Sequence, residues 1–153
     1  MATLRLEIVT VERKLFDDYV NMVVAPGSEG VLGILPHHTA LLTSLTYGEL
    51  VVKKDEYPDQ HFAIGGGFME VRPRHVVVLA DAAERADEID LARAEAARKR
   101  AEELLVQAKD SEADFSRAQA ALRRSVTRLK VARRRRSRSE PGAFQPGPDR
   151  SSD

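Results

Sequence analysis

Four arginines in the second half of the chain are the side chains whose spacing best suits chemistry, and that chemistry is the binding of phosphate or another anion. Arg93 and Arg100 lie seven residues apart and Arg124 and Arg128 lie four apart, so each pair shares one helix face. Several guanidinium groups at one level repel one another unless an anion neutralises them. Helical geometry also turns Arg124 away from the apolar stripe of its own segment, so spacing alone favours a solvated face over a binding site.

Asp90 is an acid on an apolar stripe, because helical spacing lines it up with Ala94 and Ala101. An acid that is buried at such a position needs a partner. Capping of the helix N-terminus is the simpler interpretation. An ion pair with Arg93, three residues further on, is the alternative.

Residues for catalysis or metal binding are not arranged in any familiar pattern. The chain has no cysteine, and its histidines lack metal-ligand spacing apart from the adjacent His37 and His38. No arrangement of Ser, His and Asp suggests a nucleophile elbow. Gly65-Gly66-Gly67 precedes a strand-like run, so a β-bulge or tight crossing is favoured over a phosphate loop. We therefore predict no catalytic site, no metal site and no required cofactor.

The segment that precedes these arginines has the pattern of short strands. Leu4, Leu6 and Ile8 alternate with polar residues, which is the period of a half-buried strand. Turn residues recur at a spacing of roughly 8–12 residues, which is typical of an antiparallel β-sandwich. We predict such a sandwich over residues 1–84.

The composition changes abruptly after residue 84. Residues 86–108 contain seven alanines and neither glycine nor proline, which favours a helix with Asp87 as its N-cap. A second helix follows the polar link Lys109-Asp110-Ser111, and the two would form a hairpin over residues 85–132. The predicted apolar stripes are Ala94, Ala97, Ala101, Leu104, Leu105 and Ala108 on the first helix, and Phe115, Ala118, Leu122, Val126 and Leu129 on the second. The expected fold class is α+β.

The charge is divided between the two segments, although the chain as a whole has a formal net charge of zero. Residues 1–84 carry 7 basic and 12 acidic side chains, and residues 85–153 carry 17 basic and 12 acidic ones. The Arg-rich tail over residues 133–153 cannot form a core and is expected to be disordered. It is either solvated or in contact with an acidic or phosphate surface.

A free-standing nucleic-acid-binding protein is the alternative function that the basic helices and tail suggest. The basic half contains only Phe115 and Phe144 as aromatic residues, which counts against stacking on bases. No apolar run is long enough to cross a bilayer, and the N-terminus does not resemble a signal peptide. We expect a soluble intracellular protein that could still belong to a membrane-bound assembly.

Residues 28–42, Ser-Glu-Gly-Val-Leu-Gly-Ile-Leu-Pro-His-His-Thr-Ala-Leu-Leu, resemble the signature of the epsilon subunit of F-type ATP synthases. Gly65-Gly66-Gly67-Phe68 and the strand that ends at Asp81 support the resemblance. The run Ile89-Asp90-Leu91-Ala92-Arg93-Ala94 is similar to the nucleotide-binding motif of that family. The resemblance covers about residues 3–132.

The resemblance implies a β-sandwich that docks on the gamma subunit and the c-subunit ring in the rotating central stalk, without doing chemistry itself. It further implies a hairpin that either lies on the sandwich or extends toward the alpha/beta catalytic subunits and inhibits ATP hydrolysis. In some bacterial members ATP binds the folded hairpin as a regulatory ligand. The expected location is the cytoplasmic face of a bacterial membrane, with membrane association only through the complex and no nucleic acid as partner.

The resemblance also assigns candidate residues by position. Candidates for the nucleotide site are Glu84, Ile89, Asp90, Arg93, Ala94, Arg100, Arg124 and Arg128. Candidates for the rotor interface are Glu29, Gly30, His38 and Leu42. The family commonly has glycine where His37 stands and proline where Ala40 stands. If residue 37 needs a positive φ, histidine is less comfortable there than glycine.

Overall fold

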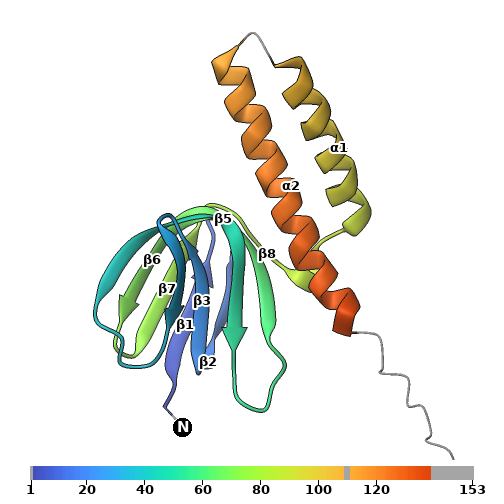
Figure 1. Cartoon of the computed structure of the whole chain (residues 1–153). Helices are drawn as coiled ribbons and strands as arrows, with labels where there is room; N and C mark the ends of the chain where they lie inside the picture. Colours follow the sequence, from blue (N-terminus) through green and yellow to red (C-terminus); the bar gives the residue numbers. More distant parts are fainter. Residues whose placement is uncertain (1, 109–110, 139–153) are drawn as a thin grey trace, which may run out of the picture.

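The strands and the helices form two distinct parts of the molecule, in a computed structural model that describes residues 2–108 and 111–138 (Figure 1). The strands are β1 Leu4–Val9, β2 Lys14–Val20, β3 Met22–Gly27, β4 Gly30–Ile34, β5 Leu41–Lys53, β6 Gln60–Arg72, β7 His75–Ala80 and β8 Ala83–Arg85. A short 3-10 helix, η1 Ala86–Glu88, leads to α1 Leu91–Gln107 and α2 Glu112–Arg138. The predicted α+β class is confirmed.

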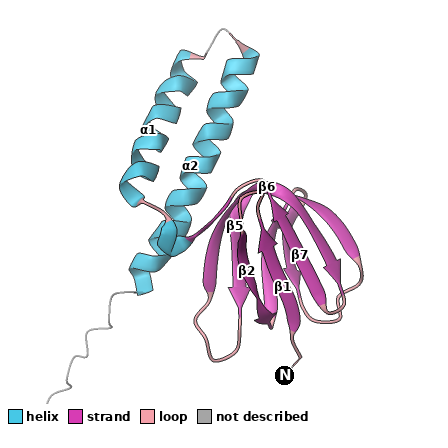
Figure 2. Cartoon of the chain, turned by 180° about the vertical axis from the view of Figure 1, so that it is seen from behind, coloured by secondary structure: helices cyan, strands magenta, loops and turns pink. Residues whose placement is uncertain are grey.

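The strands form one continuous hydrogen-bonded sheet that curls over itself to enclose a core (Figure 2). Their order is β2-β1-β7-β6-β5-β3-β4, and β8 pairs with β6. The prediction of antiparallel pairing needs one correction, because β1 and β7 run parallel, with Arg5 opposite His75. β1 and β7 lie far apart along the chain. The alternation of apolar residues within a strand does not show which distant strand pairs with it, or in which direction.

The glycine run on β6 lets the backbone of this strand pass very close to β7. Gly66 and Gly67 have φ angles of +90° and +120°. A Cβ atom on Gly67 would lie 2.1 Å from the carbonyl oxygen of Leu79, which is far inside van der Waals contact. The predicted tight crossing is confirmed, and no helix N-terminus follows the run to make a phosphate loop.

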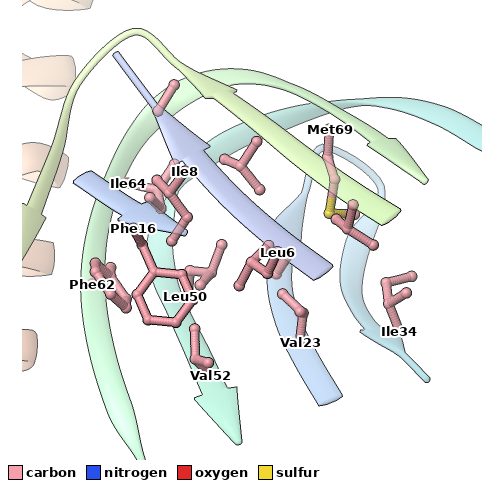
Figure 3. Packing of buried hydrophobic residues seen from close by; sticks show 14 of the residues in the cluster. Leu6, Ile8, Phe16, Val23, Ile34, Leu50, Val52, Phe62, Ile64 and Met69 are labelled. Carbon is pink, nitrogen blue, oxygen red and sulfur yellow. The ribbon is translucent and has the colours of Figure 1, made fainter. Parts of the chain in front are cut away.

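The main core lies between the two halves of the curled sheet (Figure 3). The alternating residues Leu4, Leu6 and Ile8 all point into it and are at most 1% exposed. Phe16 and Phe62 meet edge to face with ring centroids 5.7 Å apart. Each such buried side chain contributes about 1.5–3 kcal/mol through its apolar surface.

The first helix begins three residues later than predicted. Asp90, and not Asp87, is its N-cap, and the Asp90 carboxylate accepts a hydrogen bond of 3.1 Å from the backbone N–H of Arg93. Asp87 lies instead in η1, which the hydrogen bond of 2.7 Å from Arg13 to Glu88 ties to the sheet. The capping interpretation of Asp90 is therefore confirmed.

The apolar stripe of α2 differs in part from the prediction. Ala118 and Leu129 are buried as expected, but Phe115 and Val126 are 43% and 48% exposed. Ser125 is buried in their place, and its hydroxyl donates a hydrogen bond to the carbonyl of Ala121. The buried face of α2 differs from the predicted stripe because α2 packs against both α1 and the sheet, and both neighbours determine which residues are buried.

The stripe of α1 is narrower than predicted, because Leu104 is 53% exposed while Ala94 and Ala101 are buried.

At the other end of the hairpin, α2 continues past the predicted boundary at residue 132 and ends at Arg138. Arginine is a good helix former, and the first proline after Arg133 is Pro141. The predicted disorder of residues 133–153 is therefore wrong for residues 133–138, and residues 139–153 lie outside the described residues. In the described part of the chain, no helix combines the length and the apolar character that crossing a bilayer requires.

Candidate functional site

A groove between the two helices holds three of the four arginines of the sequence analysis. It has a volume of about 350 Å³ and is lined by Ala97, Arg100, Ala101, Leu104, Ala121, Arg124, Ser125 and Arg128. The alanines leave space between the helices because they carry no side chain beyond Cβ. The structure thus places Arg100 of α1 opposite Arg124 and Arg128 of α2.

Arg128 is already paired with an acid from the sheet. Its Nε and Nη2 atoms donate to the two carboxylate oxygens of Glu84 at 2.7 and 3.1 Å. Glu84 lies on β8, and both side chains are about one-third exposed. This two-bond geometry fixes the guanidinium plane and ties α2 to the end of the strand segment.

Arg124 and Arg100 keep their positive charge uncompensated. Arg124 is exposed, as its spacing predicts, but its guanidinium carbon lies 5.9 Å from the ring centroid of Tyr47 on β5. Among the described residues, the side chains of Arg93, Arg100 and Arg124 make no hydrogen bond or ion pair. Arg93 shares a helix face with Arg100 and lies nearer to the sheet. These three cations could together neutralise a polyanion such as a polyphosphate.

A second, smaller hollow adjoins the groove where α2 meets the sheet. Its volume is about 70 Å³, and its lining includes Tyr47, Gly65, Glu84, Arg124 and Arg128. Arg124 and Arg128 line both hollows, so a ligand in the groove could reach the sheet past these two residues. In the residues that the structure describes, no group of three His, Cys, Asp or Glu side chains is placed to hold a metal ion.

The remaining candidates for the nucleotide site have structural roles. Ile89 and Ala94 pack with Ala63 of β6 and with Leu129 and Val131 of α2 in a small second core. Asp90 caps α1. These residues hold the two helices at the sheet edge and so position the arginines. They do not line the groove itself.

The candidates for the rotor interface lie between the end of β3 and the first residues of β5. Glu29 lies in the exposed turn between β3 and β4, and Gly30, the first residue of β4, has a φ of +138°. The backbone N–H of Ser28 donates to the carbonyl of Ser44 at 3.0 Å, so this turn lies beside β5. Leu42 on that strand is 71% exposed.

His38 is the last rotor candidate, and it follows an unusual backbone position. The ring Nδ1 of His38 lies 2.7 Å from the carbonyl oxygen of Thr39. The preceding residue, His37, has a φ of 68°, in the left-handed region that glycine tolerates best. A histidine thus adopts the conformation for which the resemblance would expect glycine.

Two exposed apolar residues next to these candidates escaped the sequence analysis. Phe68 on β6 and Leu79 on β7 face each other across the strands and are 56% and 55% exposed. Both stand at outward positions of period-two strands, where polar residues are expected. Apolar residues at these outward positions are the sequence pattern that indicates the surface, because contiguous exposed apolar surface is typical of an interface.

Two successive parts of the chain match described protein families. Residues 3–86 match "ATP synthase, Delta/Epsilon chain, beta-sandwich domain", and residues 87–133 match "ATP synthase, Delta/Epsilon chain, long alpha-helix domain". The ATP synthase epsilon chain of Dehalococcoides mccartyi is 51% identical over 138 residues, which are 89% of this chain and 96% of that protein. The ATP synthase epsilon chain of Herpetosiphon aurantiacus is 52% identical over 135 residues, which are 88% of this chain and 98% of that protein.

Solved structures share the fold at lower identity. A chain in the OSCP/F1/c-ring part of the Euglena gracilis mitochondrial ATP synthase aligns with a TM-score of 0.74 at 22% identity and covers 86% of this chain and 82% of that chain. A chain in the central stalk and c-ring of the Tetrahymena thermophila mitochondrial ATP synthase aligns with a TM-score of 0.56 at 14% identity and covers 84% of this chain and 96% of that chain.

Proposed function

The chain belongs to the delta/epsilon-chain family of ATP synthases, and from this premise we propose that it is an epsilon subunit of the central stalk. In this role it docks on the gamma subunit and the c-subunit ring and helps to couple proton transport to ATP synthesis without catalysing a reaction itself. The observation that carries the proposal is the match of both family domains, in order, over residues 3–86 and 87–133.

The exposed apolar residues on the sheet support the docking role. Leu42, Phe68 and Leu79 come from three neighbouring strands, β5, β6 and β7. A surface of this kind loses contact with water when a rotor partner covers it. The turn before Gly30, which includes Glu29, lies beside β5 and would contact the c-subunit ring.

The hairpin would act as the inhibitory element of the subunit. Its contact with the sheet is a small core, in which Ala63 is the buried sheet residue among the residues that the structure describes, together with ion pairs of Arg128 and Arg134. An interface of this size stabilises the docked state weakly, so the hairpin can leave the sheet, extend toward the alpha/beta catalytic subunits and inhibit ATP hydrolysis.

ATP is the proposed regulatory ligand of the folded hairpin. Arg100 and Arg124 in the groove supply positive charge with no acidic partner among the described residues, and Arg93 lies one heptad before Arg100 on the same helix. ATP would bind only while the two helices lie folded together, and a ligand shifts an equilibrium only through such a difference in affinity.

The expected location of the subunit is the cytoplasmic face of a bacterial membrane, where it is held through the complex. Nucleic-acid binding, the alternative function, finds no support in the comparisons.

Deletion of residues 87–153 tests the stalk and inhibitory roles together. The truncated chain should still copurify with the gamma subunit, because the docking surface lies on the strands. ATP hydrolysis by the assembled enzyme should rise about fivefold or more, at the lower end of typical coupling between sites. Unchanged hydrolysis would contradict the inhibitory role, and loss of gamma binding would contradict the proposed docking.

Titration of the full chain with ATP tests the nucleotide site. Millimolar ATP should shift the NMR signals of the hairpin. Arg93→Ala or Arg100→Ala should raise the ATP concentration needed for half of this shift about tenfold or more, because each substitution removes a charged contact. Arg117→Ala is the matched control, since that side chain is 83% exposed and pairs with Asp114 near the start of α2. The absence of any shift in the parent chain would leave these arginines as a solvated face.

A further inference from the structure

A second electrostatic contact holds α2 to the sheet, beyond the groove and nearer to the C-terminal end of the helix. Nε and Nη2 of Arg134 donate to Oε2 and Oε1 of Glu49 at 3.1 and 3.2 Å. The side chain of Glu49 is only 9% exposed, whereas that of Arg134 is 48% exposed. The carboxylate therefore sits at the sheet surface under the helix.

His61 approaches the same carboxylate from the neighbouring strand. Its Nδ1 lies 3.4 Å from Oε2 of Glu49, the oxygen that also accepts from Nε of Arg134. The register of β5 and β6 pairs Val51 with His61 and Glu49 with Ala63, so both side chains lie on one face of the sheet. Nδ1 of His61 is buried and has no hydrogen-bond partner among the described residues.

The other charged groups around His61 come from each element packed against it. They are Asp59 in the loop just before β6, Arg85 of β8 and Asp87 of η1, and together with Arg134 of α2 they line a pocket of about 140 Å³. Asp59 pairs with Lys53 at 2.9 Å, and Arg85 donates to the backbone carbonyl of Leu15. Charges of both signs thus surround the ring, and Glu49 is the carboxylate within 4 Å of Nδ1.

We propose that His61, Glu49 and Arg134 form a pH-responsive latch, which holds α2 on the sheet while His61 is neutral and weakens when His61 takes up a proton. The latch deepens the proposed function and rests on it, because it requires the hairpin to leave the sheet.

Competition for one carboxylate gives the latch its direction. A protonated His61 donates from Nδ1 to Oε2 of Glu49 and so competes with Arg134 for that oxygen. With α2 docked, the carboxylate is shared between two cations that repel each other. With α2 released, His61 has the carboxylate to itself. Proton uptake therefore favours the released state, and the ratio of docked to released chain falls as the pH falls.

The pH range chosen for the test distinguishes protonation of histidine from protonation of carboxylates. Carboxylates with ordinary surroundings titrate near pH 4, so a change from pH 7.5 to 5.5 acts mainly on histidines. His75 is bonded to Glu7 on the strand pair β1 and β7, and His37 and His38 lie in the loop before β5. Among the described residues, His61 is the histidine that borders α2.

Distance measurements on the isolated full chain test the proposal. The chain has no cysteine, so Thr46→Cys on β5 and Lys130→Cys on α2 can carry two spin labels at exposed positions. We expect the ratio of released to docked chain to rise about threefold or more between pH 7.5 and 5.5, because a protonated histidine adds a cation that competes with Arg134 for Glu49. His61→Gln should remove this rise, and Glu49→Gln should remove it as well while raising release at pH 7.5.

His75→Gln is the matched control and should keep the full pH dependence. The latch is wrong if His61→Gln responds to pH like the parent chain, or if acid tightens docking. In either case the proposed function survives. If the labels show α2 docked at every pH, even in Arg134→Gln, both the latch and the mobility of the hairpin are contradicted. Circular dichroism confirms that each variant is folded.

Discussion

A single backbone angle makes His37 unusual at the scale of the residue. Its φ of 68° is a conformation that costs an L-residue about 1–2 kcal/mol. The backbone N–H of His37 donates to the carbonyl of Pro73 at 2.6 Å, which fixes the loop before β5 against the β6–β7 turn. The loop thus keeps a conformation suited to glycine, because its neighbours hold the backbone there.

His37→Gly should therefore leave the free energy of unfolding unchanged or raise it by about 1 kcal/mol. Glycine relieves the strained φ, and its greater freedom in the unfolded chain offsets part of the gain. His38→Gly is the matched control, and it should lower stability by about 1 kcal/mol because its φ is negative. Chemical denaturation of both variants measures the difference. A clear loss of stability in His37→Gly would contradict the strain.

Charged residues on the outer face of β1 and β2 make the stability depend on pH. The hydrogen bond from the Arg5 guanidinium lowers the pKa of Asp17 to about 2, and the hydrogen bond from Lys14 lowers the pKa of Glu7. Both carboxyls have lower pKa values folded than unfolded. For Asp17 the stabilisation is therefore complete above the unfolded pKa near 4 and is lost as the pH falls through about 2, and the lowered pKa of Glu7 acts in the same direction.

The melting temperature should accordingly fall between about pH 4 and pH 2, and Asp17→Asn should flatten this part of the profile. Glu12→Gln, in the exposed turn between β1 and β2, is the control and should leave the slope unchanged. Differential scanning calorimetry across this range gives the comparison. A profile of Asp17→Asn parallel to that of the parent would contradict the assignment.

At the scale of the element, local pattern predicted the strands better than the helices. The alternation of Leu4, Leu6 and Ile8 was sufficient because one face of a strand meets one core. The helix stripes were partly wrong, since Val126 and Ser125 exchange places as exposed and buried residues. Which face of α2 is buried depends on two neighbours, and the positions of those neighbours are absent from the local sequence.

The candidate site shows the same division. Spacing correctly predicted an exposed Arg124, but it could not predict the ring of Tyr47 beneath it, because β5 lies far away in the sequence. The pairings of Arg128 with Glu84 and of Arg134 with Glu49 depend likewise on how the hairpin docks. Long-range contacts of this kind follow from the tertiary fold and not from periodicity.

The N-cap of α1 is an element whose contribution can be measured. Asp90→Ala should lower the stability of the hairpin by about 1 kcal/mol, because the backbone N–H of Arg93 loses its acceptor. Asp87→Ala removes an acid of the same charge that does not cap α1. Hydrogen exchange of the first turn of α1 should accelerate in Asp90→Ala only. Equal acceleration in both variants would point to charge and not to capping.

At the scale of the whole molecule, two separate cores divide the chain. The large core is built from strand residues, while the small core joins Ala63 of β6 to Ile89 and the two helices. Removal of the helices therefore uncovers little of the sheet. The division explains how one part could remain bound to a partner while the other moves.

The chain without residues 87–153 should fold on its own, with a melting temperature within about 5 °C of the sheet transition of the full chain. The main core loses no buried member, and Ala63 is small, so little apolar surface becomes exposed. Calorimetry and near-UV circular dichroism of the truncated chain give the comparison. A chain that aggregates or lacks a cooperative transition would show that the sheet needs the hairpin.

The parallel pairing of β1 with β7 has a consequence for synthesis on the ribosome. β1 and β2 emerge first and can pair locally, but the inner edge of β1 stays open until His75 has left the exit tunnel. Pairings between distant parts of a chain form slowly, and an open strand edge is a site for aggregation meanwhile. The nascent subunit is therefore most vulnerable during the translation of β3 to β6, and chaperones would protect it most in that interval.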